Sequence, residues 1–142
     1  MKVNRLIGPM TAALILLTLL AMPILASAQG LKSFLATANG KGTLTVGREE
    51  FKVSSVVVKL NEDGTAEITV VTDLQLFVKG TWSSPADPAN PIDLKITGGA
   101  TGDVQGSGKL SLRPDGKSIA KLTIEGMSPT AKRKIQLDFV AD

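Results

Sequence analysis

The chain has 142 residues, with 16 Lys and Arg against 13 Asp and Glu, and it contains no cysteine, histidine or tyrosine. This length is enough for one ordinary domain. The missing residue types exclude disulfides, thiolate nucleophiles, Ser-His-Asp catalysis and histidine-based metal sites or pH switches near neutrality.

The N-terminus has the three parts of a secretory signal peptide. Lys2 and Arg5 supply the basic start, residues 12–22 form a dense apolar stretch, and an Ala-Ser-Ala sequence ends at Ala28. We therefore predict cleavage after Ala28. The alternative is an uncleaved membrane anchor, because the 23 uncharged residues of 6–28 are long enough to span a bilayer. Two prolines and the small-residue end argue against that alternative.

Cleavage would leave a mature domain of residues 29–142 outside the cytoplasm, either periplasmic or secreted, and the leader is typical of a bacterial protein. Without Lys2 and Arg5 this domain keeps 14 basic against 13 acidic residues, a net charge of +1. Such a balance gives no electrostatic case for nucleic acid or for an anionic membrane. We expect membrane contact only through an uncleaved leader. Because the domain has no cysteine, its core alone must stabilise it.

Alternation of apolar and polar residues, the pattern of half-buried strands, dominates residues 29–142. No stretch has the spacing of a crossover helix, so a parallel α/β fold is not expected. Between Val53 and Val56 the alternation slips by one residue, which predicts a β-bulge with an extra residue at Ser54–Ser55. In chain order, strands are predicted at 32–46, 50–60, 65–72, 74–82, 92–97, 103–112, 118–125 and 132–141.

Short connections predict that these strands are antiparallel. Asp63-Gly64 and Asp115-Gly116 are turn signals between consecutive strands, and residues 126–130 form a third connection. Gly-x-Gly pairs at 40–42 and 106–108 fall on the apolar side of their strands, where glycine permits sharp bending or close backbone approach. Their alternative is a place in loops. We predict an all-β meander of about eight strands forming a small barrel, with a two-sheet sandwich as the alternative.

The inward positions are almost wholly aliphatic, so the sheet encloses an apolar interior. This predicts a non-catalytic binding module for a small hydrophobic molecule. The candidate ligand contacts are Phe51, Leu76, Trp82 and Phe139. The alternative is a structural or protein-interaction module with a solid core, for which the β-rich run 65–82 would supply a pairing edge.

No motif predicts a cofactor or a metal ion, because neither nucleotide-binding nor calcium-loop spacing occurs. The only adjacent carboxylates, Glu49 and Glu50, would point to opposite faces of a strand, so they cannot act as a catalytic pair. We therefore expect that the protein is not an enzyme. The one basic run, 132–134, is interpreted as a charged strand start that protects a sheet edge. The alternative is docking of an anionic partner.

Overall fold

The computed structural model describes residues 31–73, 75–87, 89–99 and 103–142, and every regular element within them is a β-strand. The signal peptide predicted for residues 1–28 lies outside the described residues. The eight strands are β1 (Phe34–Val46), β2 (Glu49–Leu60), β3 (Thr65–Val71), β4 (Gln75–Ser83), β5 (Ile92–Gly99), β6 (Gln105–Leu112), β7 (Ile119–Ser128) and β8 (Arg133–Ala141).

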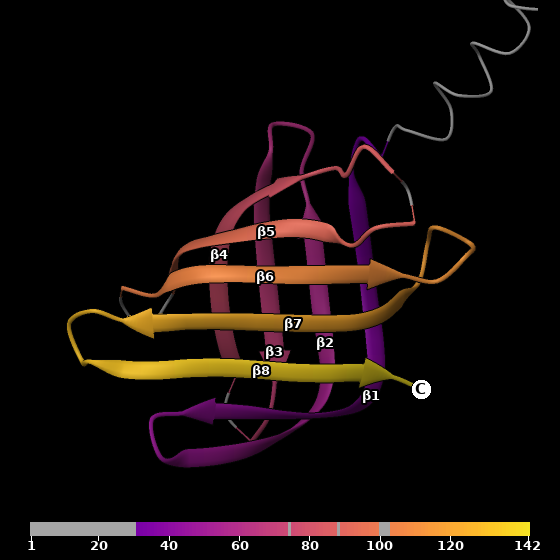
Figure 1. Ribbon diagram of the computed structural model, residues 1–142. Helices are drawn as coiled ribbons and strands as arrows, with labels where there is room; N and C mark the ends of the chain where they lie inside the picture. The colour runs from indigo at the N-terminus through magenta and orange to yellow at the C-terminus, as the bar shows by residue number, and fades with distance from the viewer. Residues whose placement is uncertain (1–30, 74, 88, 100–102) are drawn as a thin grey trace, which may run out of the picture. The chain divides into compact units, whose positions relative to one another are not determined.

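Each strand pairs with the next one along the chain, and β1 pairs with β8, so the meander closes into an antiparallel barrel. In Figure 1, β2, β3 and β4 run behind and across β5–β8. The predicted eight-stranded barrel is confirmed. The two-sheet sandwich is wrong, because a continuous ladder through β1 joins the first and last strands.

β1 forms the bend between the two sets of strands. It pairs with β2 along its length, whereas its ladder with β8 covers only Gly40 to Val46. The bend falls at the first Gly-x-Gly pair. A Cβ at Gly40 would collide with the carbonyl oxygen of Val140, and one at Gly42 with that of Asp138. Glycine therefore lets β8 cross β1 at close range.

The second Gly-x-Gly pair has the same role in β6. A Cβ at Gly106 would collide with the carbonyl oxygen of Glu125, and one at Gly108 would lie 2.6 Å from the carbonyl oxygen of Thr123. Both glycines are inside strands, so the alternative that placed these pairs in loops is wrong. The sequence pattern thus marks two places where neighbouring strands approach too closely for a side chain.

The irregularity predicted at Ser54–Ser55 is confirmed, since the buried positions of β2 shift there from Val53 to Val56. In the ladder, however, Gly40 and Lys41 of β1 lie opposite Ser54, so the additional residue belongs to β1 and not to β2. The pairing of β1 with β8 is regular across the same segment. Because the ladder with β8 is regular, the inward positions of β1 keep their alternation. The alternation of inward and outward residues therefore changes in β2.

Both predicted Asp-Gly turns are present, with positive φ at Gly64 and Gly116. Asp63 accepts hydrogen bonds from the hydroxyl (2.6 Å) and backbone N–H (2.9 Å) of Thr65, which lower the pKa of its carboxyl. The pKa of Asp115 is lowered by the backbone N–H of Lys117 and then by the hydroxyl and N–H of Ser118. Each aspartate thus fixes its own turn.

Two expectations concerned sheet edges. The run 65–82 was expected to offer a pairing edge. In the described part of the chain β3 is paired along both sides, whereas β4 is paired with β3 along its length and with β5 from Val78 onward. The basic run 132–134 was expected to protect an edge, but β8 lies between β7 and β1. Lys134 pairs with Met127 of β7, and its carbonyl oxygen accepts a hydrogen bond of 2.8 Å from Gly47 N–H. The run therefore begins an interior strand.

Candidate functional site

The four predicted ligand contacts face inward but do not share one pocket. Phe51 and Leu76 are half-buried at the end of the barrel that carries the β1–β2 and β3–β4 turns, here called the Phe51 end. Trp82 is half-buried at the opposite end, near the β2–β3 turn, here called the Trp82 end. Phe139 lies between them with no exposed surface. The structure therefore distributes these residues along the whole interior.

Trp82 closes its end of the barrel. Its indole N–H donates a hydrogen bond of 2.9 Å to the carbonyl oxygen of Asn61. Its backbone N–H donates another, of 3.0 Å, to Gly64. The ring packs against the core, so the residue ties β4 to the β2–β3 turn. Both N–H donors of Trp82 are used inside the protein, which gives this residue a packing role.

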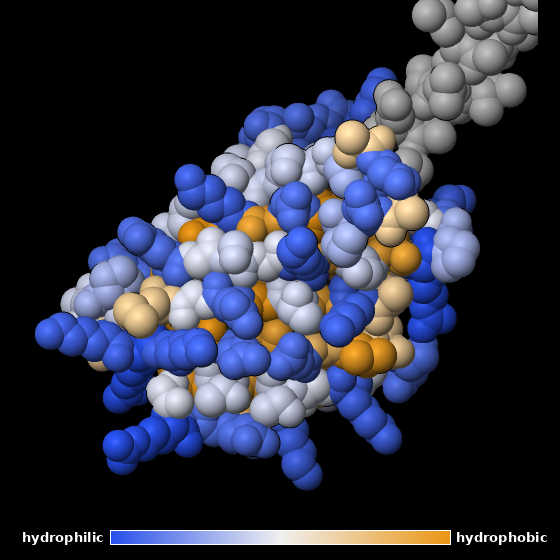
Figure 2. Space-filling model, in the orientation of Figure 1, coloured by the Kyte–Doolittle hydropathy of each residue, from blue (hydrophilic) through white to orange (hydrophobic). Residues whose placement is uncertain are grey.

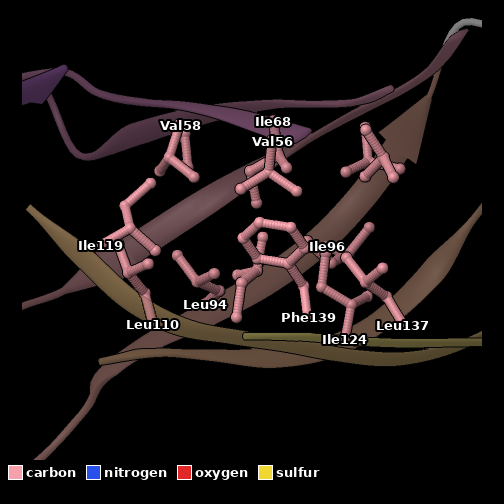
Figure 3. Packing of buried hydrophobic residues seen from close by; sticks show 14 of the residues in the cluster. Val56, Val58, Ile68, Leu94, Ile96, Leu110, Ile119, Ile124, Leu137 and Phe139 are labelled. Carbon is pink, nitrogen blue, oxygen red and sulfur yellow. The ribbon is translucent and has the colours of Figure 1, made fainter. Parts of the chain in front are cut away.

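The middle of the interior is filled by side chains. A side chain beside a water-sized void keeps surface that a water molecule can touch. In the described part of the chain, six inward residues from β2, β3, β6, β7 and β8 keep none: Val56, Val58, Val70, Leu110, Leu122 and Phe139. Figure 3 shows the ring of Phe139 pointing toward Val56 and Ile68 of the facing strands, with Leu94, Ile96 and Ile124 around it. The space around these residues is therefore occupied.

Among the described residues, no polar or charged residue is buried, and no group of three or more acidic residues gathers at metal-binding distance. Glu49 and Glu50, the adjacent carboxylates, are both exposed. Asp63 and Asp115, whose pKa values are lowered, are occupied by their own turns. The described part of the chain also contains no helix long and apolar enough to cross a bilayer.

The outer face of β5–β8 is charged and hydrophilic. In Figure 2 hydrophilic side chains cover most of this face. The exposed apolar residues Met127 and Val140 lie toward the ends of β7 and β8 on the same face. Lys109 and Asp93 form an exposed ion pair with an N–O distance of 3.9 Å, a kind of contact that stabilises little. A depression of about 280 Å³ lies on this surface, lined by Ser107, Gly108, Lys109, Thr123, Glu125, Leu137 and Asp138.

The outer face of β2–β4 is different, because two successive cross-strand rows carry no charge. Val57, Thr69 and Phe77 are directly paired in the first row. Val71 lies in the second row, between a serine and a glutamine. All four are half-buried, and we call them the uncharged face: Val57, Thr69, Val71 and Phe77.

A charged row borders the uncharged face on one side. Lys59 and Glu67 are opposite each other, with an N–O distance of 3.9 Å, and Lys79 continues the row. The Nζ of Lys79 lies 5.6 Å from the centre of the Phe77 ring. Our sequence analysis missed this face, although one signal existed: Val57, Val71 and Phe77 are apolar residues at positions where the alternation calls for polar ones.

Comparison with protein-family models, curated proteins and solved structures finds no match to this chain. Function must therefore be argued from the residues of this chain and from how the barrel places them.

Proposed function

We propose that the barrel is a non-catalytic, extracytoplasmic module that binds another protein through its outer surface, and that its interior is a structural core. The observation that carries this proposal is the set of six inward side chains without any exposed surface. An eight-stranded barrel either fills its interior with side chains or keeps room for a small ligand. The packing around Phe139 favours the first kind.

An interior ligand would have to displace side chains that already fill the barrel. Moving Phe139 or Leu122 aside would disturb contacts on several strands at once, since interiors are close-packed. The half-buried Phe51 and Leu76 at the Phe51 end are the residues that favour the second candidate function, binding of a small hydrophobic molecule. Binding a small molecule inside the barrel would require the core to open, whereas binding a protein on the outer surface would not.

The uncharged face supplies a surface suited to protein contact. Phe77 is an aromatic side chain at the β4 end of a cross-strand row, and aromatic residues often anchor interfaces. Lys59, Glu67 and Lys79 form a polar border beside it. An apolar centre with a charged border is the usual anatomy of a protein interface.

Native mass spectrometry of the chain purified without detergent from a secreting host tests this proposal. We expect the mass of residues 29–142 alone or with a bound protein. A small-molecule adduct that disappears on denaturation would contradict the proposal and favour the second candidate function. A mass that still includes residues 1–28 would overturn the predicted cleavage, and with it a freely released module.

A further inference from the structure

Among the described residues, no strand lies beside one edge of the first half of β1. The β8 ladder ends at the pair Gly40–Ala141, and the last bond beyond it runs from Asp142 N–H to Asn39 O, at 3.0 Å. Before Asn39, β1 pairs only with β2. Backbone groups of alternate residues point to the same side of a strand, so those of Leu35 and Thr37 point the same way as those of Asn39. No described residue hydrogen-bonds to them there.

This open edge also carries the most exposed large hydrophobic residue in the described part of the chain. The side chain of Leu35 is 70% exposed on the outer face. Thr37, two residues along, is directly paired with Val57, so the first row of the uncharged face reaches the edge. A strand added here would extend both the hydrogen-bond ladder and the uncharged surface.

Lysines outnumber acidic residues beside the open edge, where the described acidic neighbours are Asp142, hydrogen-bonded to Asn39, and Glu67, paired with Lys59. Lys32 precedes β1, Lys41 follows the open segment on the same strand, and Lys59 lies directly across from Leu35. A second copy paired antiparallel through its own residues 34–38 would bring the lysines of both copies to one shared edge, which like-charge repulsion disfavours. The charges therefore disfavour self-association and favour a partner strand with acidic residues.

We propose that residues 34–38 of β1 bind an extended segment of a partner protein as an added β-strand, in which acidic residues flank apolar ones. This inference rests on the proposed function and specifies the chemistry of the partner. Lysines at a sheet edge ordinarily discourage pairing with neutral or basic strands. With an acidic segment the same lysines select the partner, and the exposed Leu35 side chain packs against its apolar residues.

The test titrates a synthetic peptide, in which valine and threonine alternate between glutamate ends, into isotope-labelled protein. We expect NMR shift changes and slower hydrogen exchange at the amides of Leu35 and Thr37. Thr37→Pro removes an N–H that no described residue uses, and prolines are tolerated at strand edges. Because the variant loses a backbone hydrogen bond to the peptide, we expect binding to weaken by about tenfold.

Matched variants distinguish strand pairing at this edge from nonspecific hydrophobic or charge attraction. Leu35→Thr should weaken binding, whereas Met127→Thr, which changes another exposed apolar residue at the Phe51 end, should not. Lys41→Glu should weaken binding more than Lys95→Glu on the outer face of β5. A lysine-ended version of the peptide should bind more weakly than the glutamate-ended peptide, and equal binding of the two would overturn the charge selection.

The edge proposal is overturned if the glutamate-ended peptide does not bind, or if Thr37→Pro and Leu35→Thr bind it as well as the unmodified protein. Peptide binding that shifts only residues of the uncharged face would also overturn it, while leaving the proposed function in place. The proposed function itself fails in a different experiment, through a small-molecule adduct in native mass spectrometry.

Discussion

The outer faces of β2–β4 and β5–β8 cover the same aliphatic core but differ in chemistry. Val57, Thr69 and Phe77 form an uncharged row on the first. On the second, Lys109 is paired with Thr123, which is paired with Asp138. Either face would serve to enclose the core, because stability comes mainly from the inward side chains. The difference between the faces is therefore the basis of the binding role that we propose.

The comparison predicts that changes inside the barrel have the largest effect on stability. Phe139→Ala removes a fully buried ring from the centre, and we expect a loss of about 3–5 kcal/mol in the free energy of unfolding, measured by urea denaturation. Val140→Ala, at the next residue with a 55% exposed side chain, is the control and should change stability little. Near-equal effects of the two variants would contradict a packed interior.

Crowding between strands should have the next largest effect. A Cβ at Gly80 would collide with the carbonyl oxygen of Lys95, whereas a Cβ at Gly98 would meet nothing within 4 Å. We expect Gly80→Ala to destabilise the barrel by about 1–3 kcal/mol or more, because backbone must move. Gly98→Ala should be nearly neutral. Thermal unfolding followed by circular dichroism compares them, and a neutral Gly80→Ala would mean that β4 and β5 are farther apart than described.

A change on the uncharged face should affect binding more than stability. Phe77 is half-buried and faces outward, so Phe77→Thr removes apolar contact area and keeps a residue suited to strands. We expect a stability loss of about 1 kcal/mol together with loss of partner binding. The matched change on the charged face, Lys95→Thr, should leave binding intact. Loss of binding in the second variant alone would assign the interface to β5–β8.

The smallest expected effect concerns acid stability at two turns. The pKa values of Asp63 and Asp115 are lowered from their ordinary value of 3.8 in the folded protein. Their contribution is therefore fully present above about pH 4 and is lost as the pH falls through the lower, folded values. Stability of the double variant Asp63→Asn and Asp115→Asn should depend less on pH below about 4 than that of the unmodified protein. Denaturation measured at a series of pH values tests this. If both proteins lost the same stability below about pH 4, the two aspartates would not be the source of the acid sensitivity.

Most of the strand pattern could be predicted from the sequence, because alternation and turn chemistry are local. The Asp63-Gly64 and Asp115-Gly116 turns lie where they were expected. The inward glycines at 40–42 were also informative, since only glycine permits the close crossing found there. Local patterns could not distinguish a barrel from a sandwich, because closure depends on the pairing of β1 with β8, whose residues are distant in the chain.

The surfaces were less predictable than the strands. Sequence analysis selected Phe51, Trp82 and Phe139 because large apolar residues line the inside of a sheet, but alternation does not tell whether that inside is filled. The uncharged face depends on cross-strand register, which brings Val57 beside Thr69. The open edge of β1 depends on where β8 ends, at Ala141, relative to β1. Register and closure are tertiary properties, and they determine both candidate surfaces.

Site-specific photo-crosslinking at two matched threonines tests the central claim most directly. Thr69 and Thr123 are both half-buried and outward-facing, and each lies on a strand that is paired on both sides. The first lies on the uncharged face and the second on the charged face. A photo-crosslinking residue is placed at each position in turn, and the variants are produced in the native cells. We expect a specific protein adduct at position 69 and none at position 123. The protein identified in the adduct should also bind the purified barrel. Adducts at 123 alone, or at neither position, would contradict the proposed function.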